Sequence, residues 1–207
     1  MDTAPSSLPT MEDDLTPAAR AALAAARAEA DALRAELARL QRRLDEVELL
    51  ADRDPLTPVL NRRAFQRELT RMIAFCERYD APASLAFFDL DGFKAVNDQF
   101  GHAAGDACLQ VVAGILADHV RESDVVGRLG GDEFAVILAQ AGREAAETKA
   151  ADLQSRIEAE PVVFEGKAIA VRASFGVRTF EPGVSAAQAL AEADAAMFVR
   201  KGARRRD

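Results

Sequence analysis

The segment that decides the fold is residues 125–139, which read VVGRLGGDEFAVILA. Two short apolar runs flank Gly130-Gly131-Asp132-Glu133, and paired glycines between apolar runs strongly indicate a β-hairpin. The turn therefore carries two carboxylates, Asp132 and Glu133, at its tip. Because Gly130 and Gly131 have no side chains, a bound phosphate can approach the backbone of this turn closely.

A second acidic corner lies upstream, where the apolar run 83–88 ends in Asp89-Leu90-Asp91. We expect a buried strand with carboxylates at its exit. If this strand neighbours the hairpin, Asp89 and Asp132 converge at one edge of a sheet. Such carboxylates suit Mg²⁺, which uses one or two of them and takes further ligands from phosphates. Acidic strand ends and Gly-Gly turns are each common, however, so either one alone is explained equally well without a ligand.

Other patterns predict helices and strands in alternation around these two corners. A hydroxyl followed by proline at Thr57-Pro58 predicts the start of a helix that runs to about residue 79. Further predicted elements are a helix after Asp91 to about 120 that is interrupted near Gly101-His102, a helix over 143–159, a second hairpin of 162–164 and 168–177 around Glu165-Gly166-Lys167, and a last helix with a capping box at Ser185 and Gln188. We therefore predict an α+β fold, with a central, mostly antiparallel sheet wrapped by helices.

The N-terminal region has a different pattern, a mobile tail over residues 1–15 and then a long helix. From Thr16-Pro17 onward, small or apolar residues recur at alternating steps of three and four, which is a heptad seam. The seam consists of Leu23, Ala26, Ala30, Leu33, Leu37, Leu40, Leu44, Val47 and Ala51. We predict a coiled-coil dimerisation helix over 16–51 and a globular domain over 52–207. A single amphipathic helix packed on its own domain is the alternative, but the narrow seam and charged outer faces favour the coiled coil.

Composition excludes several classes of protein. The chain has 207 residues and 49% hydrophobic residues, enough for one packed domain with an extension. Its net charge of −8 repels phosphate backbones, so we expect no nucleic-acid partner. Cys76 and Cys108 lie in apolar stretches and are most simply buried thiols in a reducing compartment. The sequence shows neither a signal peptide nor a membrane span of about 18 apolar residues. We therefore expect a cytoplasmic protein that does not bind membranes.

Residues 130–134 contain the letters GGDEF, and further blocks follow the order of one family. These blocks are Asp54-x-Leu56-Thr57, Asn61-Arg62-Arg63, Phe88-Asp89-Leu90-Asp91-x-Phe93-Lys94-x-x-Asn97-Asp98, Gly101-His102-x-x-Gly105-Asp106, Ser174-x-Gly176, and Ala193-Asp194-x-Ala196-Met197 before Lys201. Over about residues 52–207 the chain resembles the GGDEF diguanylate cyclase family. The resemblance implies a catalytic domain related to the palm of nucleotidyl cyclases and polymerases, which condenses two GTP molecules to cyclic di-GMP and releases two pyrophosphates.

The resemblance also implies roles for the acidic residues. Asp89 and Asp132 would bind the metal, Mg²⁺ or alternatively Mn²⁺, with help from the Leu90 carbonyl. In the family, the position of Asp132 is credited with accepting the proton of the ribose 3′-hydroxyl. We favour a metal that lowers the pKa of this hydroxyl and a carboxylate or water that removes the proton. Glu133 would be a second acidic contact to metal or nucleotide.

The substrate residues implied by the resemblance are Phe93, Lys94, Asn97, His102, Asp106, Lys201 and Arg205. Asn97 and Asp106 match positions that read guanine, whereas His102 is equally well explained as a polar residue at a helix end. Lys201 and Arg205 would bind the terminal phosphates. The sequence departs from the family at Arg204 and Arg206, which replace glycine and asparagine and which we read as a solvated basic tail. It also departs at Pro58, where glycine is usual, and at Phe198, where tyrosine is usual.

Arg121-x-x-Asp124 precedes the signature turn at the spacing of the family's inhibitory product site. A guanidinium and a carboxylate can bond the two edges of guanine. Because one site holds one GTP, two domains must face each other, and the N-terminal helix would hold them together as a homodimer. Two other functions stay open, namely a receptor for GTP or cyclic di-GMP and a purely structural dimerisation module.

Overall fold

The computed structural model describes residues 16–50 and 52–204. The contacts divide the chain after Leu50 into two compact units. The first contains helix α1 (Pro17–Leu50), whose start is capped by the Thr16 hydroxyl, an acceptor at 3.3 Å from the Ala19 amide. Within the described ranges, no helix combines the length and the apolar character needed to cross a membrane. The tail predicted over 1–15 lies outside the described residues.

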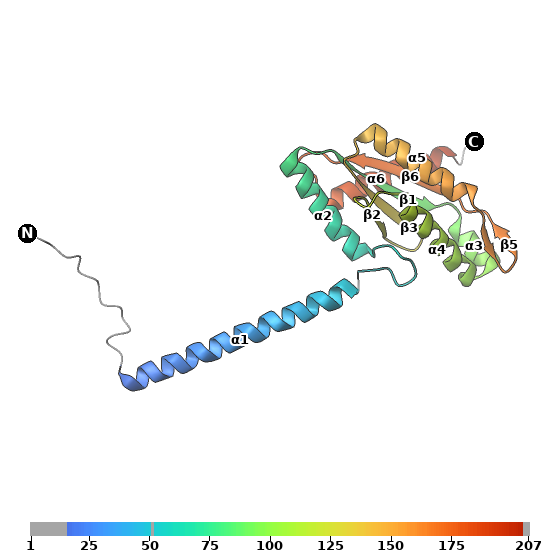
Figure 1. The fold of residues 1–207 in the computed structure, drawn as a ribbon. Helices are drawn as coiled ribbons and strands as arrows, with labels where there is room; N and C mark the ends of the chain where they lie inside the picture. Colours follow the sequence, from blue (N-terminus) through green and yellow to red (C-terminus); the bar gives the residue numbers. More distant parts are fainter. Residues whose placement is uncertain (1–15, 51, 205–207) are drawn as a thin grey trace, which may run out of the picture. The chain divides into compact units, whose positions relative to one another are not determined.

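The second unit is built on a four-stranded sheet in the order β2-β3-β1-β6 (Figure 1). Its strands are β1 (Ala83–Leu90), β2 (Val125–Arg128), β3 (Glu133–Ala139) and β6 (Ala173–Thr179). All three pairings are antiparallel, which confirms the predicted sheet. Strands β2 and β3 form the hairpin expected around the paired glycines.

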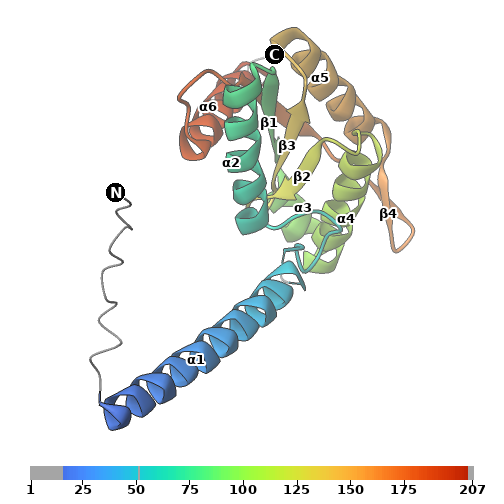
Figure 2. The same cartoon turned by 60° about the vertical axis from the view of Figure 1, so that its left-hand side comes forward.

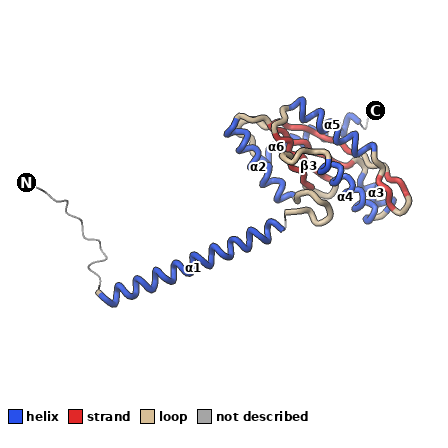
Figure 3. Tube along the Cα trace, viewed as in Figure 1, coloured by secondary structure: helices blue, strands red, loops and turns tan. Residues whose placement is uncertain are grey.

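Helices cover both faces of this sheet (Figures 2 and 3). One face packs against α2 (Arg62–Tyr79) and α6 (Ala186–Arg204), and the other against α4 (His102–Asp118) and α5 (Arg143–Ala159). Because side chains alternate along a strand, Leu85 and Phe87 of β1 join the first core, whereas Ala86 and Phe88 join the second. Helix α3 (Phe93–Phe100) follows β1 directly and packs against α4.

The first helix of the domain begins later than predicted. Helix α2 starts at Arg62 rather than near Thr57, and its N-cap is Asn61, whose side chain accepts the Ala64 amide at 3.0 Å. The Thr57 hydroxyl instead donates to Asp54 at 2.8 Å. Leu60 forms a bridge with Gly127 of β2, so the chain stays extended before the helix.

The predicted strand 168–177 was also wrong as a single element. Residues Lys167–Ile169 form β5, which pairs with β4 (Val162–Phe164) in a separate two-stranded sheet. Strand β6 begins at Ala173 and joins the main sheet beside β1. The capping box at Ser185 is half formed, because the Ser185 hydroxyl accepts the Gln188 amide at 3.2 Å but the Gln188 side chain donates to Glu192.

Candidate active site

The end of β1 brings the two acidic corners together. Asp89 is the register partner of Glu133 on β3 and of Ser174 on β6. The Leu90 amide donates to the Asp132 carbonyl at 3.2 Å. The hairpin turn and the exit of the central strand therefore share one edge, as the sequence predicted.

The Arg128 side chain stabilises the signature turn, residues 130–133. Its guanidinium donates to the Gly131 carbonyl at 2.7 and 3.2 Å and to the Asp54 carboxylate at 3.1 Å. Burial alone would raise the pKa of Asp54, but hydrogen bonds from Thr57 and Arg128 lower it overall. The motif around Asp54 was recognised from the sequence, but this positioning role of Arg128 was not.

Lys201 of α6 reaches into the acidic corner. Its ammonium pairs with Asp89 and lies 3.2 Å from Asp91, which also accepts hydrogen bonds from the buried Ser174 hydroxyl at 2.9 and 3.1 Å. Burial lowers the pKa of Lys201, but the hydrogen bond and charge of Asp89, followed by those of Asp91, raise it overall. The sequence assigned Lys201 to substrate phosphates and did not predict its pairing with these acids. Nor did it give Asp91 or Ser174 a role, although both stand in the recognised motifs.

The turn carboxylates have pKa values above their usual range. Burial is the main cause of the raised pKa of Asp132, and the nearby charge of Asp89 adds to it. For Glu133, burial is followed by the charges of Asp194, Asp132 and Asp89. Carboxylates crowded in this way favour a cation beside them.

The acidic corner offers few protein ligands for a divalent ion. Within residues 16–50 and 52–204, no group of three or more His, Cys, Asp and Glu side chains is arranged to hold a metal. Mg²⁺ needs only one or two protein carboxylates when phosphates and waters complete its shell. Asp89 and Asp132, whose charges interact, match this requirement in number and in ligand type. The ammonium of Lys201 on Asp89 shows that this position attracts a positive charge.

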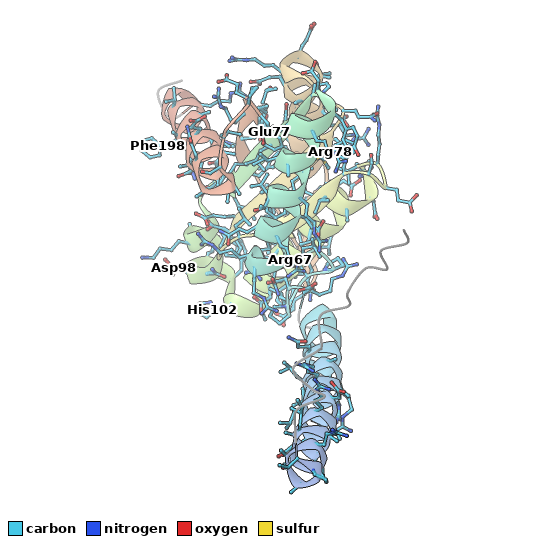
Figure 4. The ribbon with its side chains drawn as sticks, turned by 90° about the vertical axis from the view of Figure 1, so that its left-hand side faces the viewer. Arg67, Glu77, Arg78, Asp98, His102 and Phe198 are labelled. Carbon is cyan, nitrogen blue, oxygen red and sulfur yellow. The ribbon has the colours of Figure 1, made fainter. Side chains whose placement is uncertain are left out.

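Apart from Lys201 on α6 and Arg205, the predicted nucleotide contacts lie on α3 and α4. Lys94 is exposed on the first turn of α3, and Asn97 is half-buried further along this helix. On α4, His102 and Asp106 are exposed, and His102 projects outward from the start of the helix (Figure 4). The Phe93 side chain packs partly against the core. Arg205 lies outside the described residues.

Arg121 and Asp124 form the turn between α4 and β2. The Asp124 carboxylate accepts the Arg121 amide at 2.9 Å and the Ala139 amide at 3.0 Å, so it also stabilises the local backbone. Both residues line a cavity of about 1000 Å³ that His119 and Lys149 also border. The cavity therefore has positive and negative groups on its wall.

Comparison with known sequences identifies relatives of this chain. Residues 51–207 match the family described as diguanylate cyclase, GGDEF domain. The chain is 36% identical over 152 residues to the diguanylate cyclase DgcP of Pseudomonas aeruginosa, covering 73% of this chain and 23% of that protein. It is 35% identical over 162 residues to the probable diguanylate cyclase DgcE of Escherichia coli, covering 78% of this chain and 15% of that protein. The chain thus spans less than a quarter of either relative.

Two solved structures share the architecture. The coiled coil and GGDEF domain of DgcB from Caulobacter crescentus, in complex with c-di-GMP, aligns with a TM-score of 0.73 and 29% identity over 86% of this chain and 94% of that chain. A sensory box/GGDEF family protein from Caulobacter crescentus aligns with a TM-score of 0.70 and 35% identity over 73% of this chain and 99% of that chain. The predicted fold class is confirmed.

Proposed function

The chain belongs to the GGDEF domain family of diguanylate cyclases, and we propose that it condenses two GTP molecules to cyclic di-GMP and two pyrophosphates. The observation that carries this proposal is the acidic corner, where the Leu90 amide bonds the Asp132 carbonyl and Asp89 stands opposite Glu133. An intact signature turn beside the carboxylates of the central strand is what this phosphoryl transfer needs. We expect the reaction to occur in the cytoplasm.

Different residues of the site would bind the metal and accept the proton. Asp89, Asp132 and the Leu90 carbonyl would hold Mg²⁺ or Mn²⁺, which when bound polarises phosphate oxygens and lowers the pKa of a coordinated hydroxyl. A turn carboxylate, that of Asp132 or Glu133, would accept the proton, and the raised pKa of both, caused by burial and neighbouring charge, suits a proton acceptor.

We assign substrate binding to basic, amide and carboxylate side chains around this corner. Lys94 and Lys201, with Arg205, would neutralise phosphate charge, while the Asn97 amide and the Asp106 carboxylate would bond guanine. Lys201 would exchange Asp89 for a phosphate when the nucleotide arrives, since the ammonium is already at this edge. Phe93 and His102 complete the proposed substrate contacts.

The test of the proposal is product formation by the full chain. Incubation with GTP and Mg²⁺ should yield cyclic di-GMP and pyrophosphate, detected by chromatography. Asp132→Asn should abolish the product while circular dichroism and cooperative melting stay intact. Absence of product from the dimeric wild-type chain would refute the cyclase proposal, and guanine-nucleotide binding without turnover would indicate a receptor instead.

We further propose that α1 joins two copies in a parallel coiled coil. The seam residues Leu33, Leu37 and Leu40 are 65%, 58% and 52% exposed in the single chain, and burying such a stripe against a second copy would stabilise a dimer. The DgcB structure, which aligns over 86% of this chain, contains a coiled coil, and this supports the assignment. The seam residues Leu44, Val47 and Ala51 lie outside the described side chains.

Analytical ultracentrifugation tests the dimer. Changing Leu33, Leu37 and Leu40 together to glutamate should give a monomer at micromolar concentration with strongly reduced turnover. Ala35→Glu, on the opposite side of the heptad, is the matched control and should stay dimeric. A wild-type monomer with full activity would contradict the proposal.

Product feedback is proposed at the cavity bordered by Arg121 and Asp124. The DgcB structure was determined with c-di-GMP, and the cavity of about 1000 Å³ combines a guanidinium with a carboxylate. Because Asp124 also bonds two backbone amides, Arg121 is the better residue to change. Arg121→Ala should raise the product concentration needed for half inhibition, whereas Arg78→Ala, a surface arginine over Tyr79, should not. An unchanged inhibition curve for Arg121→Ala would remove this site.

A further inference from the structure

Gly105 of α4 lies directly beneath the side chain of Asn97. A Cβ atom built at Gly105 would lie 1.9 Å from the Asn97 Oδ1 atom and 3.0 Å from its Cγ atom. The same atom would lie 3.2 Å from the Phe93 ring. The space that a side chain would occupy at Gly105 is thus filled by the Asn97 carboxamide.

The backbone does not require glycine at this position. Gly105 is buried inside α4, its amide donates to the Gly101 carbonyl at 3.2 Å, and its φ is not among the positive values of the chain. Alanine is intrinsically more favourable than glycine inside a helix. The missing Cβ therefore serves the contact between α3 and α4 rather than the local helix geometry.

This contact joins the two residues proposed to read guanine. Asp106 follows Gly105 on α4, and Asn97 comes from α3, so Gly105 determines how closely the amide can approach the turn that carries the carboxylate. We propose that Gly105 is a positioning residue that holds the Asn97 amide where it bonds the N3 and N2 edge of guanine. This inference rests on the proposed function, because it assumes that Asn97 contacts the base.

A methyl group at Gly105 would push the Asn97 side chain out of this place. Since the atom that it meets first is the end of a side chain, rotation of Asn97 relieves the clash, and the fold is expected to survive. Base recognition, not folding, is the property that should change. Gly114 provides a matched control on the same helix, because a Cβ there would meet nothing within 4 Å.

The experiment measures calorimetric affinities of the full chain for GDP and IDP, which cannot condense and which differ by the 2-amino group. Gly105→Ala should weaken GDP binding and reduce the preference for GDP over IDP by roughly three- to tenfold, as expected for one lost hydrogen bond. Gly114→Ala should leave both values unchanged. In the Asn97→Ala background, Gly105→Ala should have no further effect on the preference.

Unchanged affinity and preference in Gly105→Ala would overturn the inference, as would an effect that persists without Asn97 or a wild-type chain that does not prefer GDP. If Gly105→Ala loses cooperative unfolding, adding Asn97→Ala should restore it, because the clashing atom is removed. Failure of this rescue would also overturn the inference. A wild-type chain that binds GDP but makes no cyclic di-GMP would refute the proposed reaction and leave the positioning role to be decided by these titrations.

Discussion

Replacing Lys201 with methionine removes the ammonium that neutralises the acidic corner while keeping much of the side-chain volume. In the structure this ammonium pairs with Asp89 and lies 3.2 Å from Asp91. The three side chains are only 17%, 19% and 25% exposed, so water screens the pair incompletely. Lys201→Met would leave these two carboxylates without the ammonium that both contact.

The expected loss of stability follows from these contacts. Hydrogen bonds to charged groups are worth about 1.5–3 kcal/mol each. Asp91 keeps its bonds from Ser174 and partial exposure lowers both values, so we expect a total of about 2–3 kcal/mol. For a domain of this size, the expected fall in Tm is about 5–10 °C in metal-free buffer.

A divalent cation should reverse much of this loss. A ligand that binds only the folded chain raises its stability by RT ln(1 + [L]/Kd). Without Lys201, Mn²⁺ meets no competing ammonium at Asp89, so it should raise the Tm of Lys201→Met more than that of the wild type. Differential scanning calorimetry in EDTA and in excess MnCl₂ measures both values.

Lys167→Met is the matched control, because Lys167 is exposed on β5 and should change neither Tm nor the response to Mn²⁺. If Lys201→Met melts like this control and responds to Mn²⁺ like the wild type, Lys201 does not neutralise the acidic corner. The interpretation of its ion pair would then be wrong.

Three further predictions concern the turn and the packing around it. Burial and a nearby charge raise the pKa of Asp132 above 3.8, so this residue takes up a proton on folding and its contribution to the free energy of unfolding falls as pH rises above that value. Asp132→Asn should flatten this decline in calorimetry from about pH 4 to 7, and an equally steep decline would contradict the assignment. Arg128→Ala removes the charged partner of Asp54 and should cost about 2–3 kcal/mol in urea denaturation, whereas a loss under about 0.5 kcal/mol would refute its role in fixing the turn. Gly176→Ala would place a Cβ atom 2.2 Å from the backbone of α6 and should cost about 2–3 kcal/mol in urea denaturation. Gly114→Ala is the control, and equal stabilities of these two variants would show that α6 can move away freely.

The sequence predicted the sheet and the acidic corner because the signals for both are local. Paired glycines between apolar runs determine the hairpin, and the carboxylates of the turn follow from their place in it. The meeting of Asp89 with Glu133 required only that β1 and β3 be neighbours, which the structure confirms. Short-range chemistry was sufficient for the hairpin, whereas the pairing of β1 with β3 was a condition that only the structure could confirm.

Errors arose where two local signals competed for one group. Thr57-Pro58 is a good helix start by composition, but the Thr57 hydroxyl is already bonded to Asp54, and Asn61 caps the helix instead. Residues 168–177 have the apolar pattern of one strand, yet they divide between two sheets because their partners differ. Composition could not decide between the two local partners of Thr57, and the partners of residues 168–177 are set by the tertiary structure.

The sequence could not predict contacts across the site, because these contacts join separate elements of the tertiary structure. The pairing of Lys201 with Asp89 joins residues that are far apart in the chain, and the motif spacing indicated only a phosphate ligand. The place of Gly105 beneath Asn97 depends on how α3 turns back on α4. Gly105 stood in a recognised motif, but only the packed structure shows that a side chain is excluded there and which atom excludes it.

The electrostatics of the acidic corner link stability to the proposed function. Burial and mutual repulsion raise the pKa values of Asp132 and Glu133, so the charged forms of these residues are costly in the chain alone. A divalent cation brought by a triphosphate would relieve this cost, and the relief contributes to nucleotide affinity. Lys201 supplies only one positive charge, enough to hold Asp89 and Asp91 in place but less than a metal ion offers. If the proposed function holds, Lys201 orders the corner in the chain alone, and the stronger cation would displace its ammonium when the nucleotide binds.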